Sequence, residues 1–127
     1  MHIDVKKSET GYLIPMSLQE LPFTPKRVFV VKNKFQNADR GGHAHVEEEH
    51  YLVCVAGSVE IKYENYSGTG MFTLQTGASH HQRELEWLNL RFKENDTMLL
   101  VFSDQEYSES RYVRDYENFK GLLGART

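Results

Sequence analysis

The sequence predicts an all-β fold, an antiparallel sandwich or barrel with one short helix near its C-terminal end. Short segments rich in β-branched and aromatic residues follow one another along the chain, with turn residues between them. No helical pattern separates these segments, so the alternation of strand and helix that is typical of a parallel sheet is missing. At 127 residues the chain is long enough to bury a core without disulfides. We therefore expect one domain spanning residues 1–127.

The expected strands are bounded by turn residues. The longest begins at the first histidine of a His-Ala-His motif and continues through an apolar run, after which Gly57 and Ser58 turn the chain tightly into the next strand. We expect strands at residues 3–5, 12–14, 27–31, 43–55, 59–63, 71–74, 87–92 and 98–102.

Two connections and one helix complete the predicted architecture. Pro22 and Pro25 indicate a rigid connection into the strand at residues 27–31, and the turn-rich residues 63–70 indicate a hairpin loop at the surface. Residues 115–124 are acidic at their start and end at a glycine, which is typical of a helix, and we expect this helix to lie across the barrel. Its apolar residues recur near helical spacing: Tyr116, Phe119, Leu122 and Leu123.

The composition argues against several classes of function. The net charge is −3 and no basic stripe stands out, which disfavours nucleic-acid binding. No apolar run approaches the ~20 residues of a membrane span, and the first residues do not resemble a secretory signal. The single cysteine, Cys54, lies in an apolar run, as suits a core residue in a reducing cytosol. We therefore expect a cytoplasmic protein without nucleic-acid or membrane partners.

The strongest functional signal is the pair His43 and His45, which follows Arg40 and two glycines in what we expect to be a loop. Side chains two residues apart on an extended chain project from the same face, so both imidazoles are expected to point into one cavity. Three interpretations are open at this point. The pair is hydrogen-bonded and structural, or it binds a metal together with Glu49 or His50, or it carries protons in catalysis.

Other polar residues bear on the nature of the ligand. Guanidinium groups pair bidentately with phosphate, so Arg27 and Arg40 suit an anionic ligand, with solvated surface charges as the alternative. The acidic residues 47–49 are expected to form a solvated rim, with one carboxylate hydrogen-bonded to a histidine, fixing its tautomer and raising its basicity, as the alternative. His80 and His81 lie in a polar, turn-like stretch and are expected in a loop outside the site.

Several blocks of the sequence resemble the nucleotide-sugar 3,4-ketoisomerases of the cupin superfamily. They occur in the family's order and span nearly the whole chain: LPFTPKRVF at 21–29, RGGHAH at 40–45, LVCVAGS at 52–58, VFSD at 101–104 and YSESRYVRDYENF at 107–119. The resemblance implies a cupin double-stranded β-helix, which is a jelly-roll barrel, and a homodimer that exchanges N-terminal strands. It also implies an isomerase of nucleotide-sugar biosynthesis that moves the carbonyl of a dTDP-linked 4-keto-6-deoxyhexose from C4 to C3 without a metal or other cofactor. The product is a 3-keto sugar that an aminotransferase then uses.

This chemistry suits the residues. A base within hydrogen-bond reach can remove the proton next to a ketone while a donor stabilises the enolate oxygen, and reprotonation of the neighbouring carbon completes an isomerisation through an enediol. By its match to the family's first histidine, His43 is the expected base that takes the C3 proton and delivers one to C4. His45 is expected to donate to or orient the enediol oxygens, and swapped roles stay open. Arg27 and Arg40 match family arginines near the site and are expected to contact the diphosphate or the sugar.

The chain departs from the family pattern in three places. Residues 8–11 lack the arginine of an Asp-x-Arg-Gly motif, and residues 29–30 are Phe-Val where a tyrosine pair is common. Residues 88–89 are Leu-Asn where the family has His-Glu after the tryptophan, which weakens the metal interpretation because leucine cannot ligate. Trp87 itself is expected in the core, with ligand stacking as the alternative.

Polar and aromatic residues elsewhere are the candidates to complete the pocket, with His50 among them. The residues expected to bind substrate are Arg27, Arg40, Tyr51, Tyr63, Trp87 and Asn89. Two alternatives to the isomerase stay open. One is a metal-dependent cupin enzyme that uses His43 and His45, and the other is a non-catalytic cupin that binds a sugar nucleotide.

Overall fold

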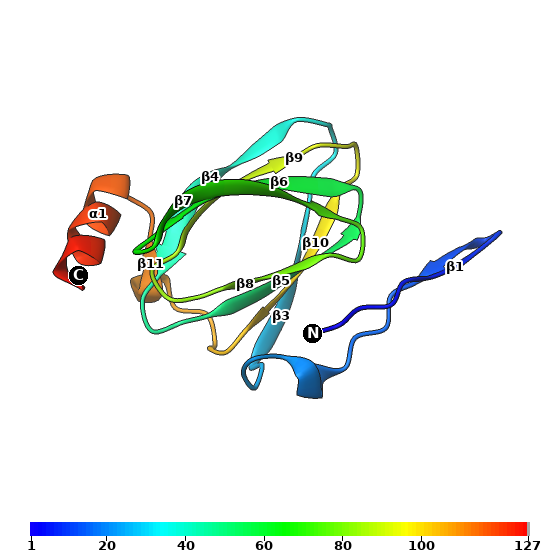
Figure 1. Ribbon diagram of the computed structural model, residues 1–127, viewed down its shortest axis with the longest axis horizontal. Helices are drawn as coiled ribbons and strands as arrows, with labels where there is room; N and C mark the ends of the chain where they lie inside the picture. The colour runs from blue at the N-terminus through cyan, green and yellow to red at the C-terminus, as the bar shows by residue number, and fades with distance from the viewer. Residues whose placement is uncertain (127) are drawn as a thin grey trace.

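Two antiparallel sheets face each other and form a flattened jelly-roll barrel (Figure 1). The structure is a computed structural model and describes residues 1–126. The strands of the four-stranded sheet are, in order, β3 (Arg27–Lys32), β10 (Met98–Ser103), β5 (His50–Ala56) and β8 (Ser79–Gln82). Those of the five-stranded sheet are β11 (Tyr112–Val113), β4 (Ala38–His45), β9 (Trp87–Phe92), β6 (Ser58–Asn65) and β7 (Gly68–Gln75). The prediction of an all-β fold with a C-terminal helix is confirmed.

The core lies between the two sheets because each strand turns every second side chain inward. Its buried members come from both sheets: Leu52, Cys54, Val59, Ile61, Leu74, Leu88, Leu90, Phe92, Leu99 and Val101. Cys54 is therefore a core residue, as predicted. Gly57 makes the predicted tight turn between β5 and β6 with φ of 73°, and a Cβ there would lie 2.3 Å from Thr97 Oγ1.

The predicted long strand at residues 43–55 is wrong, because it consists of two strands. Residues 46–49 form a turn between β4 and β5, in which Glu47 has a φ of 57°. Acidic residues have low strand propensity, so the chain breaks there and crosses from one sheet to the other. The Arg-Gly-Gly segment predicted as a loop belongs to β4, where the register with β9 shifts between Arg40 and His43.

Three smaller expectations also need correction. Residues 3–5 are not a strand, and the N-terminal hairpin consists of β1 (Lys6–Ser8) and β2 (Gly11–Leu13). The polar residues expected as a loop at His80 and His81 form β8, which lacks the apolar pattern of a strand and pairs with β5. The hairpin expected at residues 63–70 is tighter than predicted, because β6 and β7 pair as far as Asn65 and Gly68.

The C-terminal helix α1 (Tyr116–Ala125) begins where predicted, because the Asp115 carboxylate accepts a hydrogen bond from the Asn118 amide. It continues past Gly124, and it lies beside β11 at one end of the barrel instead of across it (Figure 1). Its buried residues Phe119 and Leu123 pack with Ala44, Trp87 and Val113. Within residues 1–126, no helix is long and apolar enough to cross a membrane.

The β1–β2 hairpin projects away from the barrel (Figure 1). Its residues are exposed, and the Tyr12 hydroxyl donates a hydrogen bond to the Val55 carbonyl. The preceding and following segments contribute Met1, Ile3, Met16, Leu21 and Phe23 to a second apolar cluster on the outer face of the four-stranded sheet. The N-terminal residues therefore anchor to the barrel while the hairpin itself remains in solvent.

Two neighbouring glycines, Gly41 and Gly42, precede His43, and their replacement by alanine tests how tightly this end of the barrel is packed. A Cβ on Gly42 would lie 2.3 Å from Trp87 Nε1, and the indole has little room to move because it packs against Phe119. We expect Gly42→Ala to lower the free energy of unfolding by about 1–3 kcal/mol through overpacking, as measured by urea denaturation. Gly41→Ala is the matched control, since its Cβ meets nothing within 4 Å. Equal losses in both variants would contradict the packing described.

Candidate active site

Polar residues gather at the end of the barrel where β4, β6, β8 and β10 finish. In the four-stranded sheet, one row of directly paired residues crosses this end: Arg27, Ser103, His50 and Gln82. Directly paired residues share a face of the sheet. Val101 and Leu52 of the core lie two residues farther along the same strands, so by alternation the polar row also faces the interior.

The five-stranded sheet places the histidine pair opposite this row. His43 pairs with Leu88 of β9, which is a core residue, so His43 and His45 both face the interior. The prediction that the two imidazoles point the same way is confirmed. Their ring centroids lie 4.9 Å apart, and the His45 ring lies 3.9 Å from that of His50 and 4.7 Å from that of Tyr112. Strand β11 brings Tyr112 directly beside His45.

The carboxylate of Glu48 connects these groups. The prediction of a solvated acidic rim is wrong for this residue, whose side chain is fully buried. Its Oε2 atom accepts hydrogen bonds from Arg27 Nη2 at 2.9 Å, His50 Nε2 at 2.5 Å and Ser103 Oγ at 3.1 Å. Burial alone would raise the pKa of Glu48, but the hydrogen bond and charge of His50 and the hydrogen bonds of Arg27 and Ser103 outweigh it, and the pKa is lowered. Glu48 is therefore an anion inside the barrel.

The two histidines are neutral bases at physiological pH. Burial, helped by the positive charges of His50 and Arg114, lowers the pKa of His43 to about 4. Burial and the charge of His50 also lower the pKa of His45 well below its ordinary value. Neither ring nitrogen of His45 has a hydrogen-bond partner among residues 1–126, although the residue is fully buried. A buried polar group without a partner is costly, so this imidazole is a candidate to meet a ligand.

His45, Glu48 and His50 each offer one potential ligand atom for a metal, and these atoms lie within 4.8 Å of one another. The contacts that these residues already make disfavour a divalent cation, although Glu48 Oε1 and both His45 nitrogens have no hydrogen-bond partner among residues 1–126. Glu48 Oε2 and His50 Nε2 already bond to each other, and the Arg27 guanidinium neutralises the carboxylate. A unit charge about 4 Å from the guanidinium is repelled by about 4 kcal/mol at an effective dielectric constant near 20, and a divalent ion by twice that. Glu49, the alternative ligand expected from the sequence, pairs instead with His81 on the outer face of the four-stranded sheet.

Arg27 lies at the site as predicted, but its Nε and Nη2 groups already donate hydrogen bonds to other groups of the protein. Nη2 binds Glu48 and the Tyr112 hydroxyl, and Nε binds the Gln105 carbonyl. Its ring neighbours are Phe29 and Tyr107, with distances of 4.9 and 5.4 Å from the guanidinium carbon to the ring centroids. The two N–H groups on Nη1 are the ones left to contact a ligand.

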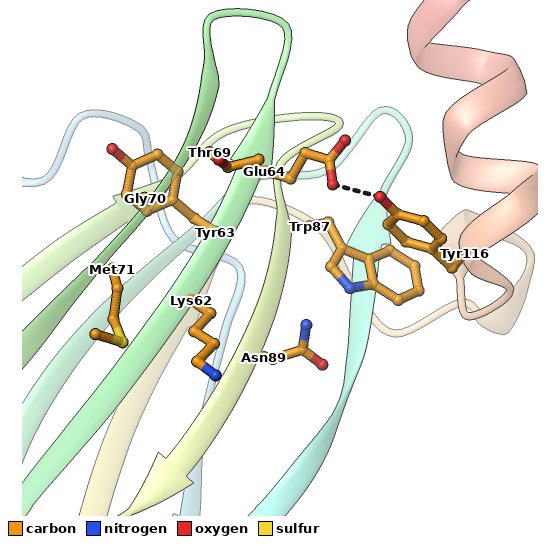
Figure 2. Close-up of a pocket in the computed structure, with 9 residues that line it drawn as sticks. All are labelled: Lys62, Tyr63, Glu64, Thr69, Gly70, Met71, Trp87, Asn89 and Tyr116. Carbon is orange, nitrogen blue, oxygen red and sulfur yellow. Dashed lines mark hydrogen bonds between the residues drawn. The ribbon is translucent and has the colours of Figure 1, made fainter.

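Several residues predicted to bind substrate lie apart from the histidines. Trp87 and Asn89 alternate with inward-facing Leu88, so they line a hollow on the outside of the barrel together with Tyr116 of α1 (Figure 2). Trp87 is buried against that helix, as the core prediction has it. Tyr63 is directly paired with Leu88 and faces the interior, while its edge also lines this hollow. Strand alternation thus separates Trp87 and Asn89 from the site.

Tyr51 and Arg40 are also placed elsewhere. Tyr51 belongs to the apolar cluster on the outer face of the four-stranded sheet, where its hydroxyl bonds with Ser79. Arg40 is exposed and lines a groove with Asn89 and Arg91. Because adjacent residues of a strand face opposite ways, the inward orientation of His50 excludes Tyr51 from the same cavity.

The residues at or beside this end of the barrel that were not among the predicted site residues are Glu48, His80, Gln82, Ser103 and Tyr112. Arg27 donates to Glu48 and Tyr112, and Ser103 donates to Glu48. His80 faces inward beside Phe72 and hydrogen-bonds to Glu86 at 2.5 Å. His80 is paired with Leu52 of the core. The signal for Tyr112 was its place in the block at residues 107–119. The bond between Glu48 and His50 matches the alternative that one carboxylate of residues 47–49 contacts a histidine, but the burial of Glu48 follows from the turn between the sheets.

The chain matches the family model described as FdtA, WxcM-like, C-terminal, over residues 1–124. A relative from Aneurinibacillus thermoaerophilus, the TDP-4-oxo-6-deoxy-alpha-D-glucose-3,4-oxoisomerase, is 29% identical over 106 residues, which are 83% of this chain and 76% of the relative.

Two solved structures share the fold. A 3,4-ketoisomerase from Helicobacter canadensis superposes with a TM-score of 0.83 at 29% identity, covering 97% of this chain and 94% of that one. A mutant of the 3,4-ketoisomerase QdtA from Thermoanaerobacterium thermosaccharolyticum, crystallised in complex with TDP-4-keto-6-deoxyglucose, gives a TM-score of 0.86 at 23% identity, covering 98% and 92%. The predicted jelly-roll barrel of the cupin type is confirmed by these matches.

Proposed function

This chain belongs to the FdtA family, described as WxcM-like, C-terminal, and from that membership we propose that it is a nucleotide-sugar 3,4-ketoisomerase. The substrate is a dTDP-linked 4-keto-6-deoxyhexose and the product is its 3-keto isomer. The names of the relatives from Aneurinibacillus and Helicobacter support this activity, and the TDP-sugar bound to QdtA supports the ligand class. The observation that carries the proposal is a pair of neutral imidazoles facing the interior of the barrel.

The reaction needs a base at carbon and donors at oxygen. His43 is half-buried, and as a free base it removes the C3 proton, so that the electron pair forms the C3–C4 double bond of the enediol and O4 gains a proton. Return of a proton to C4 and loss of the O3 proton then leave the carbonyl at C3. His45 has two unpartnered nitrogens with which to donate to or accept from these oxygens. No electrons enter or leave the sugar, so the chain's own side chains suffice for each proton transfer.

Arg27 supplies the positive charge at the site. Its Nη1 donors are positioned to contact the diphosphate or a sugar oxygen, while Glu48 and Tyr112 hold the guanidinium in place. Arg40 lies farther along β4 in an exposed groove, so its predicted contact with the diphosphate is not supported by its placement.

Two expectations from the sequence stay predictions. One is that the protein is cytoplasmic, and the other is that residues 1–127 form a single domain.

The exposed N-terminal hairpin supports a homodimer that exchanges this segment between subunits. Every residue of β1 and β2 is exposed, including Tyr12 and Leu13, and Val28 and Val30 are exposed on the edge strand β3. Unpaired edge strands with apolar side chains favour pairing with another chain. We expect sedimentation equilibrium to give about twice the chain mass of 14.8 kDa, and a chain without residues 1–14 to sediment closer to a monomer. A monomeric full-length chain would contradict the exchange.

The activity is tested directly by incubating the protein with dTDP-4-keto-6-deoxyglucose in deuterated water and following the sugar by NMR. We expect the 3-keto isomer with deuterium at C4, because a proton held by an imidazole exchanges with solvent unless the transfer is shielded. An unchanged substrate would contradict the isomerase. Hydrogen retained at every ring carbon without transfer of the C3 label would exclude the enediol route. Binding measured as thermal stabilisation without turnover would favour the non-catalytic alternative.

Replacement of the proposed base separates catalysis from binding. We expect His43→Asn to lower turnover by at least ~100-fold, as loss of a general base does, while the affinity for dTDP stays largely intact. His81→Asn is the matched control, since His81 lies on the outer face of the four-stranded sheet. Near-normal turnover of the His43 variant would assign the base to another group, with His45 the first to examine.

A further inference from the structure

One tyrosine, Tyr112, connects the histidine pair to Arg27. Its ring stacks on that of His43, with centroids 5.7 Å apart and ring planes 28° apart, and it meets the His45 ring nearly at right angles at 4.7 Å. Its hydroxyl accepts a 2.7 Å hydrogen bond from Arg27 Nη2. The side chain faces the interior, because Tyr112 is paired directly with His45 while the next residue, Val113, packs in the cluster around α1.

Neighbouring side chains hold this phenol in place. The guanidinium carbon of Arg114 lies 4.7 Å from the centroid of the Tyr112 ring, and Arg114 is itself held by two hydrogen bonds to Glu109. The ring of Tyr107 packs 5.7 Å from that of Tyr112. A donor that is fixed before the substrate binds needs no reorganisation during the reaction. The Tyr112 hydroxyl is therefore set beside the proposed base in advance.

The bond from Arg27 uses the oxygen of this hydroxyl and leaves its proton available. A phenol hydroxyl can accept and donate at the same time. No acceptor for the Tyr112 hydroxyl proton is present among residues 1–126. The guanidinium that donates to the oxygen also polarises the O–H bond, because hydrogen bonds in a chain strengthen one another. Tyr112 thus offers a strengthened donor without a partner, next to two imidazoles.

The isomerisation places charge on two oxygens in turn. As the C3 proton leaves, negative charge develops on O4, and O3 later becomes the new carbonyl oxygen. A neutral imidazole has a single N–H, so His45 can donate to only one of these oxygens at a time. We propose that the Tyr112 hydroxyl is a catalytic residue that donates a hydrogen bond to the carbonyl oxygen of the bound keto sugar. Its proton stays on the phenol oxygen, and the bond stabilises the charge of the enediolate. This role rests on the proposed function, because it assigns a donor to that reaction.

The first test removes only the hydroxyl. Tyr112→Phe keeps the ring that packs against both histidines, and we expect kcat with dTDP-4-keto-6-deoxyglucose to fall by ~100-fold, as loss of one oxyanion donor does. KM should stay within about threefold, because the bond strengthens mainly as charge develops. The matched control is Tyr116→Phe, since the Tyr116 hydroxyl donates to Glu64 outside the barrel (Figure 2). At least half of the normal kcat in Tyr112→Phe, or equal losses in both variants, would overturn the proposal.

The second test separates donation to the sugar from support of Arg27. If the hydroxyl only held the guanidinium, its loss would raise KM more than it lowers kcat, and that result would count against the proposal. The direct readout is the ¹³C signal of the C4 carbonyl of labelled substrate bound to His43→Asn, in which slow turnover preserves the ketone. We expect this signal to move upfield when Tyr112→Phe is added, because the carbonyl loses a polarising hydrogen bond. An unchanged signal would contradict the contact. Tyr116→Phe in the same background should leave the signal in place.

Failure of the donor role and failure of the proposed function give different results. If the unmodified protein does not isomerise the sugar, the proposed function fails whatever the behaviour of Tyr112→Phe. If the unmodified protein isomerises the sugar and Tyr112→Phe is equally fast, only the donor role fails. The carbonyl measurement needs binding without turnover, so it decides whether Tyr112 contacts the ketone in either case.

Discussion

A single buried carboxylate holds the functional end of this barrel together. Glu48 accepts hydrogen bonds from Arg27 of β3, His50 of β5 and Ser103 of β10, which lie on three adjacent strands of the four-stranded sheet. A buried anion is stable only when it is neutralised and hydrogen-bonded, and these three donors supply both at its Oε2 atom. Arg27 then fixes the Tyr112 hydroxyl, which carries the connection across to β11 and the histidine pair.

The consequence for chemistry is a cavity whose bases are neutral. Inside the barrel the Glu48 carboxylate is paired with Arg27 and hydrogen-bonded to His50, while burial keeps His43 and His45 as free imidazoles. Proton abstraction next to a ketone needs a free base and a nearby donor more than it needs a permanent charge on the base itself. The Arg27 guanidinium pairs with Glu48 and would repel a cation bound to the same carboxylate.

The outer surface of the five-stranded sheet serves a different purpose. Trp87 and Ala44 turn away from the cavity and receive Phe119 and Leu123 of α1, so the helix closes the outside of the strands that carry the histidines. Gly42 leaves space for the indole directly before His43. The position of the first histidine is therefore supported from behind by packing and from within by its contact with Tyr112.

Local periodicity was enough to predict an all-β barrel, the C-terminal helix, and two histidines on one face, because these depend on neighbours along the chain. The family resemblance supplied the chemistry. It did not reveal that Glu48 is buried, that residues 43–55 are two strands, or that Trp87 and Asn89 face away from the cavity while Leu88 faces into it. Those features depend on which strands pair and at which register, and on donors brought from residues as distant as Arg27 and Ser103. Alternation along one strand tells which side chains share a face, and only the packing of the two sheets decides which face is the inside.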